Sequence, residues 1–197
     1  MPENCYEAKK IIKDLGYKKI HACPNDCMPY WKKNSNLDAC PHCDFSTWKP
    51  PKSHVRDNTH ASSNKIKKKA AKVFHWFPLK PRLQRLFLSP ELATNMKWYA
   101  TGRTNDGVIR HPADSEAWKL FDGKHVEFSS DPYNVRLGLT ANGFNLYENK
   151  STTHSTWPIV LVPYNIPSWM CMKRSSFTLS LVIPGPTLPG IAIDVYL

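Results

Sequence analysis

The chain has 197 residues and a formal net charge of +11 at pH 7; 41% of its residues are hydrophobic, and it has 17 prolines against 8 glycines. That length allows one large domain or two small ones. No apolar run approaches the roughly 18 residues of a membrane span, so we expect no membrane partner. The excess of proline over glycine predicts many loops and few long helices.

The first fifty residues predict a helix followed by a small module of short strands. Asn4 can cap a helix from Pro2 to Leu15, and Gly16 can terminate it. Short strands are expected at Lys19 to Ala22 and at Met28 to Lys32. They lead into and out of the first of two cysteine pairs, as in a zinc ribbon.

Four cysteines form these two pairs, the first within Cys23-Pro-Asn-Asp-Cys27 and the second within Cys40-Pro-His-Cys43. Each pair fits on one tight turn, so both of its thiolates can reach a metal ion at roughly 2.3 Å. Four protein ligands leave no open position for water. The spacing therefore predicts a structural Zn²⁺ site and not a catalytic one.

Two other interpretations of the cysteines remain open: two disulfides, or four free thiols. No segment that resembles a secretory signal precedes the cluster, and a reducing compartment disfavours disulfides. His21 and His42 flank the site and could replace a thiolate, although four cysteines already complete the ligand set.

The segment between Lys52 and Arg103 is strongly basic, with twelve Lys or Arg against only Asp57 and Glu91. Such density beside a zinc module is typical of a polyanion contact, in which neutralised phosphates release counterions, and it predicts DNA as a partner. Alternatively, the segment is a solvated linker that carries a nuclear localisation signal. Both interpretations predict the nucleus. The candidate nucleic-acid-binding residues are Lys65, Lys67, Lys68, Lys69, Lys72, Lys80, Arg82 and Arg85.

Between Val73 and Gly123 the pattern is helical. Pro81 can begin a first turn, and Ser89-Pro90-Glu91 supplies an N-cap, a first-position proline and an acidic first turn for a helix that reaches Tyr99. A further helix is expected from Asp114 or Ser115 to Phe121, with Gly123 at its C-cap. We expect the aromatic side chains of these helices in the core and not in a ligand site.

From Val135 onward the pattern changes to strands. They are expected at Val135 to Thr140, Ile159 to Val162 and Phe177 to Ile183, and Asn142-Gly143 predicts a turn after the first. Three consecutive strands predict the antiparallel half of a larger mixed sheet, which we expect to be cut within the domain. Ile191 to Leu197 predicts the start of a helix that would cover this sheet.

Several motifs together give the chain a resemblance to a known family. They are Pro2-Glu-Asn-Cys-Tyr-Glu-Ala-Lys-Lys, His21-Ala-Cys-Pro-Asn-Asp-Cys27, Phe77-Pro-Leu-Lys-Pro-Arg-Leu-Gln-Arg85, Arg110-His-Pro-Ala-Asp-Ser-Glu-Ala-Trp118, Val135-Arg-Leu-Gly-Leu139, Val162-Pro-Tyr-Asn165 and Ile183-Pro-Gly-Pro186. The chain resembles an internal segment of the transposase of plant CACTA-type (En/Spm) DNA transposons. The motifs cover nearly its whole length in the family's order.

The resemblance implies an RNase H-like core that cuts and rejoins DNA with two Mg²⁺ ions held by an Asp-Asp-Glu set. The family's first carboxylate lies in a Leu-Gly-Leu-x-x-Asp-Gly-Phe-Asn context, where this chain has Asn142. A neutral amide lacks the charge that gathers Mg²⁺. The other two carboxylates are expected beyond Leu197. We therefore expect Mg²⁺ only in an intact family member, assign no catalytic residue, and expect Asp106, Asp114 and Asp122 in turns and caps.

The predicted fold class is α+β. Residues 1–50 are expected to form a helix and a four-cysteine, zinc-ribbon-like module, 51–72 a basic flexible linker, 73–130 a helical region, and 131–197 the first three strands of a truncated RNase H-like mixed sheet. The expected function is that of a truncated, catalytically inactive transposase fragment whose zinc-stabilised basic region binds nucleic acid. The alternative is a non-catalytic zinc-dependent DNA-binding or protein-interaction module derived from a transposase.

Overall fold

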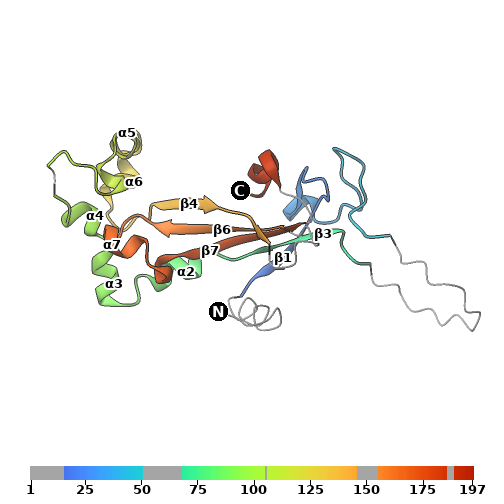
Figure 1. The fold of residues 1–197 in the computed structure, drawn as a ribbon, viewed down its shortest axis with the longest axis horizontal. Coiled ribbons are helices and arrows are strands. Elements are labelled where there is room, and N and C mark those ends of the chain that lie inside the picture. The colour runs from blue at the N-terminus through green and yellow to red at the C-terminus, as the bar shows by residue number, and fades with distance from the viewer. Residues whose placement is uncertain (1–15, 51–67, 105, 146–154, 186–188) are drawn as a thin grey trace, which may run out of the picture. The chain divides into compact units, whose positions relative to one another are not determined.

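The structure is a computed structural model that describes residues 16–50, 68–104, 106–145, 155–185 and 189–197 (Figure 1). The helix expected from Pro2 to Leu15 and most of the expected linker lie outside these residues. The chain divides into two compact units. Unit 1 comprises Met1–Tyr17, Phe77–Asn142 and Pro158–Leu181, and unit 2 comprises Lys18–Trp76, Gly143–Trp157 and Val182–Leu197.

Unit 2 is built around strand β1 (Lys18–Ala22), which pairs antiparallel with β2 (Pro29–Tyr30) on one side and β3 (Lys72–Trp76) on the other. The two strands expected around the first cysteine pair are thus present. β2 is shorter than expected because the backbone of Lys32 adopts a φ of +50°, which ends extended pairing, and the 3-10 helix η1 (Lys32–Asn34) follows.

Strand β3 corrects the expectation that the helical region begins at Val73. Val73, Phe74 and Trp76 are β-branched or aromatic side chains, which favour strands, and Phe74 is buried opposite Ile20 of β1. The residues just before β3 are also held in place, although they were expected in the linker. Ala70 forms a β-bridge with Trp48, and the Ala71 N–H donates to the Thr47 carbonyl at 2.8 Å.

Helices lie at the three expected places of unit 1, as α2 (Lys80–Arg85), as α3 (Pro90–Asn95) with α4 (Trp98–Thr101), and as α5 (Glu116–Lys124). Unit 1 also contains four short helices that were not expected individually: η2 (Pro112–Asp114), α6 (Val126–Ser130), α7 (Ser168–Cys171) and η3 (Arg174–Ser176). Ser89 is the N-cap residue of α3, as expected, but the helix is interrupted before α4. Ser115 caps α5 by accepting a hydrogen bond from the Trp118 N–H at 3.3 Å. Gly123 lies inside α5, and the C-cap is His125.

The core of unit 1 gathers helix and strand residues around Met96, Val162, Ile166 and Cys171, all buried. Strand β4 (Leu137–Ala141) pairs antiparallel with β6 (Ser155–Pro163), and the register places Leu139 opposite Leu161. Both strands were expected from the sequence, β6 with narrower bounds.

The turn expected at Asn142-Gly143 is absent. Ala141 pairs with Ile159, and beyond the interruption Phe144 of β5 (Phe144–Asn145) pairs with Thr156 in the same register. The chain therefore continues along β6 and does not reverse. Gly143 is needed here for another reason: a Cβ at this position would overlap the indole ring of Trp157.

Strand β7 (Thr178–Gly185) precedes the 3-10 helix η4 (Gly190–Tyr196), which takes the place of the helix expected from Ile191. The described strands form one antiparallel sheet in the order β2-β1-β3-β7-β6-β4, with β5 also paired to β6. The α+β class is therefore confirmed. Within the described residues, no helix has the length and apolar character needed to cross a membrane.

Candidate metal centre and nucleic-acid interface

The first cysteine pair lies on a tight loop between β1 and β2. The Cys23 N–H donates to the Met28 carbonyl at 3.0 Å, and the Asp26 N–H donates to the Cys23 carbonyl at 3.0 Å. Asp26 adopts a φ of +57°, a left-handed conformation that Asp tolerates better than most residues. The loop therefore turns sharply enough to bring both of its thiols to one side.

The second pair is built in a similar way. The Cys40 N–H donates to the Phe45 carbonyl at 2.9 Å, and the Asp44 N–H donates to the Cys40 carbonyl at 2.8 Å. Asp44 also has a φ of +57°. A proline follows the first cysteine of each loop and fixes φ there.

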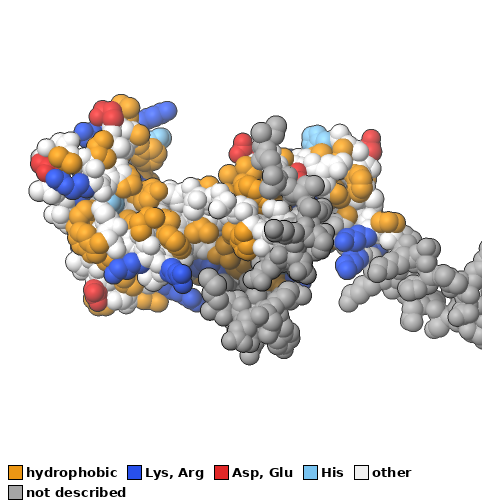
Figure 2. Space-filling model, in the orientation of Figure 1, with side chains coloured by type: hydrophobic (Ala, Val, Ile, Leu, Met, Phe, Trp, Pro, Cys, Tyr) orange, Lys and Arg blue, Asp and Glu red, His pale blue; other side chains and the backbone are white. Residues whose placement is uncertain are grey.

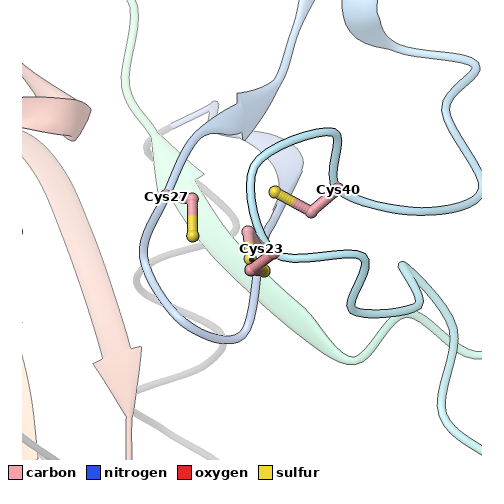
Figure 3. A group of neighbouring side chains, drawn as sticks. Cys23, Cys27 and Cys40 are labelled. Carbon is pink, nitrogen blue, oxygen red and sulfur yellow. Dashed lines mark hydrogen bonds between the residues drawn. The ribbon is translucent and has the colours of Figure 1, made fainter.

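The two loops bring all four thiols together, as the spacing predicted. The sulfur atoms of Cys23, Cys27, Cys40 and Cys43 all lie within 4.8 Å of one another, and none is in a disulfide. Figure 3 shows side chains from both loops converging on one space. A tetrahedral ion bonded to sulfur at about 2.3 Å needs sulfur–sulfur separations of about 3.8 Å. The observed cluster is compatible with that geometry after small side-chain adjustments.

The acidities of the thiols show why this cluster suits a cation. The Phe45 N–H, donating to the sulfur of Cys43, lowers the pKa of that thiol to about 7. The neighbouring Cys43 sulfur in turn raises the pKa of Cys27 to about 12, and burial raises the pKa of Cys23. Four adjacent thiolates repel one another unless a cation lies between them. Soft thiolate ligands in this number favour Zn²⁺.

The surroundings of the site hold the loops in place. The cysteines pack with buried Tyr30 and with Met28 and Leu37. The Thr47 hydroxyl donates to the Leu37 carbonyl at 2.7 Å, which ties the second loop to the chain that follows it. Neither flanking histidine belongs to the thiol cluster: the ring of His21 stacks edge-on against Trp48, and His42 is exposed.

The candidate nucleic-acid-binding residues divide between the two units. In unit 2, Lys65 and Lys67 lie outside the described residues. Lys68 and Lys69 are both exposed. The ammonium group of Lys68 lies 3.3 Å from the Asp38 carboxylate and 5.4 Å from the centroid of the Trp48 ring. The side chain of Lys72 is only 10% exposed and forms an ion pair with Asp26 of the first cysteine loop.

In unit 1 the three candidates lie on α2. The Arg82 guanidinium donates to the Leu179 carbonyl at 3.1 Å and lies over the Phe77 ring, 5.0 Å from its centroid. Burial lowers the pKa of Arg82. Lys80 and Arg85 are exposed. On the face drawn in Figure 2, Lys and Arg side chains form separate small groups and no continuous patch. Binding of nucleic acid by these residues stays a prediction.

The three carboxylates expected in turns and caps before β4, those of Asp106, Asp114 and Asp122, have structural roles. Asp106 pairs with Arg110 at 2.7 Å, and Asp114 accepts the His111 N–H at 2.9 Å to cap η2. Asp122 instead pairs with buried Arg136 at 2.6 Å. Among the described residues, the four cysteines are the only group of three or more side chains that could hold a metal ion.

Sequence reasoning missed two clusters. Arg136 lies within 6 Å of four aromatic rings in unit 1, those of Tyr99, Trp118, Phe121 and Phe128. In unit 2, Tyr196 and Lys72 both contact Asp26. The aromatic spacing of α5 gave a partial signal for the first cluster. No sequence signal links positions 26 and 196.

Comparison with known proteins gave one family. Residues 106–197 match the model of a family described as transposase family tnp2. No curated protein and no solved structure matches the chain. The matched stretch is similar to a transposase family, covers less than half of the chain and does not include the cysteine loops.

Proposed function

We propose that the chain is a transposase-derived, catalytically inactive protein that binds DNA in the nucleus and is stabilised by one structural Zn²⁺ ion. The match of residues 106–197 to transposase family tnp2 carries this proposal. The resemblance of the motifs to plant CACTA-type transposases supports a narrower lineage within it.

The inactivity is proposed from the position of Asn142. The order β7-β6-β4, with antiparallel pairing of β4 and β6, supports an RNase H-like arrangement of the three strands. When the chain is compared with the motif of the plant CACTA-type transposases, Asn142, which directly follows β4, stands where that family has its first metal-binding carboxylate. An amide has no charge to offer Mg²⁺, and Asp106, Asp114 and Asp122, which precede β4, are used in a cap and in ion pairs. These residues do not fit a two-metal site.

The zinc proposal rests on the donor set alone. Cys23, Cys27, Cys40 and Cys43 would hold the ion, and four thiolates would supply a closed, structural site. Because the four ligands come from two separate loops, metal binding is expected to contribute on the order of 10 kcal/mol to the folding of these loops. Protein purified under reducing conditions should contain about one zinc, and metal analysis that finds none would remove this part of the proposal.

DNA binding is tested by its salt dependence. A complex driven by phosphate contacts weakens steeply as salt is raised, because counterions are released on binding. Replacing Lys65, Lys67, Lys68 and Lys69 together with Gln should weaken binding to unrelated sequences and flatten the salt slope. The matched comparison is Lys68→Gln with Lys69→Gln, from the run, against Lys33→Gln with Lys49→Gln, exposed lysines outside it.

A protein-interaction module is the second candidate. The contacts of Lys72 and Arg82 favour it, because these two cations are already engaged inside their own units. If the quadruple variant binds DNA as tightly as the parent at every salt concentration, the basic run is a nuclear localisation signal or a linker. The protein-interaction module then replaces the DNA-binding protein as the proposed function.

Absence of catalysis is tested with Mg²⁺ and transposon-end DNA. The chain and its Asn142→Asp variant should both fail to cleave or join strands, because one carboxylate cannot hold two divalent ions. Mg²⁺-dependent cleavage by the unaltered chain would overturn the proposed inactivity.

A further inference from the structure

The first cysteine loop carries a second set of contacts that the metal site does not require. The carboxylate of Asp26, between Cys23 and Cys27, accepts a hydrogen bond from the hydroxyl of Tyr196 and forms an ion pair with Lys72. The Asp26 and Lys72 side chains are only 11% and 10% exposed. In Figure 1 the red η4 lies beside the blue loop segment.

These contacts form a closed arrangement around Tyr196. Its ring stacks edge-on against buried Phe74 of β3 with centroids 5.2 Å apart, and the ammonium group of Lys72 lies 5.8 Å from the ring centroid. Burial, and then the hydrogen bond to Asp26, raise the pKa of Tyr196, so its hydroxyl stays protonated and remains a donor. A hydrogen bond to a charged acceptor in such a place is among the stronger ones in proteins.

The conformation of the loop fixes where Asp26 points. Its φ of +57° belongs to the turn that brings Cys23 and Cys27 together. Any change that opens this turn therefore moves the Asp26 carboxylate away from Tyr196 and Lys72. Asp44 has the same φ in the second loop, yet it is exposed and forms no ion pair within the described residues. Of the two loops, only the first has this additional connection within the part of the chain that the structure describes.

We propose that Asp26, Lys72 and Tyr196 are positioning residues that couple the cysteine site to η4, so that metal binding fixes the C-terminal segment 190–196. The inference rests on the proposed zinc site. It also gives Lys72 a role distinct from phosphate contact: its charge neutralises Asp26 beside the thiolates and holds Tyr196 in place. Residues 190–196 lie inside the region that matches transposase family tnp2, so the metal site acts on a segment of that region.

The test is hydrogen exchange of the full chain, read by mass spectrometry on peptides that cover residues 189–197. The amides of Ala192 and Leu197 report on η4, since they donate to the Pro189 and Asp194 carbonyls. Tyr196→Phe removes only the hydroxyl and keeps the ring against Phe74. Asp26→Asn removes the charge and tolerates the same φ. Asp44→Asn is the matched control in the second loop.

Zinc content is first confirmed at one ion per chain in every variant. The η4 amide hydrogens should then exchange at least about tenfold faster in Tyr196→Phe and in Asp26→Asn than in the parent. Asp44→Asn should exchange at the parental rate. By reciprocity of coupled sites, the first two variants should also lose zinc to a chelator more readily than Asp44→Asn.

Two failures are distinguishable. If the parent contains no zinc, the proposed metal site is wrong. If all variants contain zinc but exchange in η4 as slowly as the parent, the site is correct and the coupling to the C-terminal segment is refuted.

Discussion

Replacing Arg136 should destabilise unit 1 far more than replacing an arginine with an equally short ion pair at the surface. The Arg136 guanidinium pairs with Asp122 at 2.6 Å and lies 4.3 Å from the Trp118 ring centroid, with three further rings within 6 Å. Arg136→Met keeps the apolar stem and removes the charge. The matched control is Arg110→Met, because Arg110 pairs with Asp106 at 2.7 Å but is 54% exposed.

The expected magnitude follows from burial. Each cation–π contact contributes roughly 0.5–1 kcal/mol, so four contacts give about 2–4 kcal/mol. Loss of the ion pair also leaves Asp122 without its partner. Since that carboxylate is 34% exposed, we add only about 1 kcal/mol for it. Arg136→Met should therefore cost about 3–5 kcal/mol. Arg110→Met should cost no more than about 0.5 kcal/mol, as exposed pairs do.

Urea unfolding followed by tryptophan fluorescence measures both free energies, since Trp118 is part of the cluster. Arg136→Lys separates charge from shape: the ammonium keeps the charge but cannot stack as a plane, so its cost should be intermediate. Equal destabilisation by Arg136→Met and Arg110→Met would show that the aromatic rings contribute nothing to holding this cation. The reasoning from burial would then be refuted.

Two further predictions concern close packing and pH. Gly138→Ala should destabilise the β4–β6 pair by about 1–3 kcal/mol in the same urea assay, because the added Cβ would overlap the Tyr164 ring. The control is Gly123→Ala, which has open space around the added Cβ and should cost nothing. Equal effects of the two substitutions would contradict the close approach of Gly138 to the Tyr164 ring. Burial lowers the pKa of His111, whose Nε2 lies 3.2 Å from the Ile166 carbonyl. The folded state therefore favours the neutral ring, and the free energy of unfolding should fall as pH drops below the unfolded pKa of about 6.5. In a series of urea unfolding measurements from about pH 8 to about pH 5, this free energy should fall less in His111→Gln than in the parent.

The local features of the fold were open to prediction from sequence. The cysteine spacing specified two tight loops, and the pattern Ser89-Pro90-Glu91 specified the start of α3, because each depends on residues only a few positions apart. The exact contacts between distant segments were not. Asp26 and Tyr196 are 170 positions apart, and nothing in either neighbourhood indicates the other.

Two of the wrong expectations share a physical cause. Gly143 follows an asparagine, a pair typical of tight turns, yet here the glycine makes room for Trp157 within an extended segment. Val73 to Trp76 was grouped with the helices that follow it, although its β-branched and aromatic residues fit the space beside β1. In both cases a partner distant in sequence decided the conformation.

The way unit 2 is assembled has a consequence for how this gene segment can vary. Its three stretches, Lys18–Trp76, Gly143–Trp157 and Val182–Leu197, alternate with those of unit 1, and strands β6 and β7 contribute residues to both. No single cut in the chain releases the cysteine loops together with the strands that complete their unit. Removing the whole stretch Lys18–Trp76 would leave β7 without its neighbour β3 and expose an unpaired edge to aggregation. The unit that contains the cysteine loops thus includes two stretches, Gly143–Trp157 and Val182–Leu197, of the region that matches the transposase family.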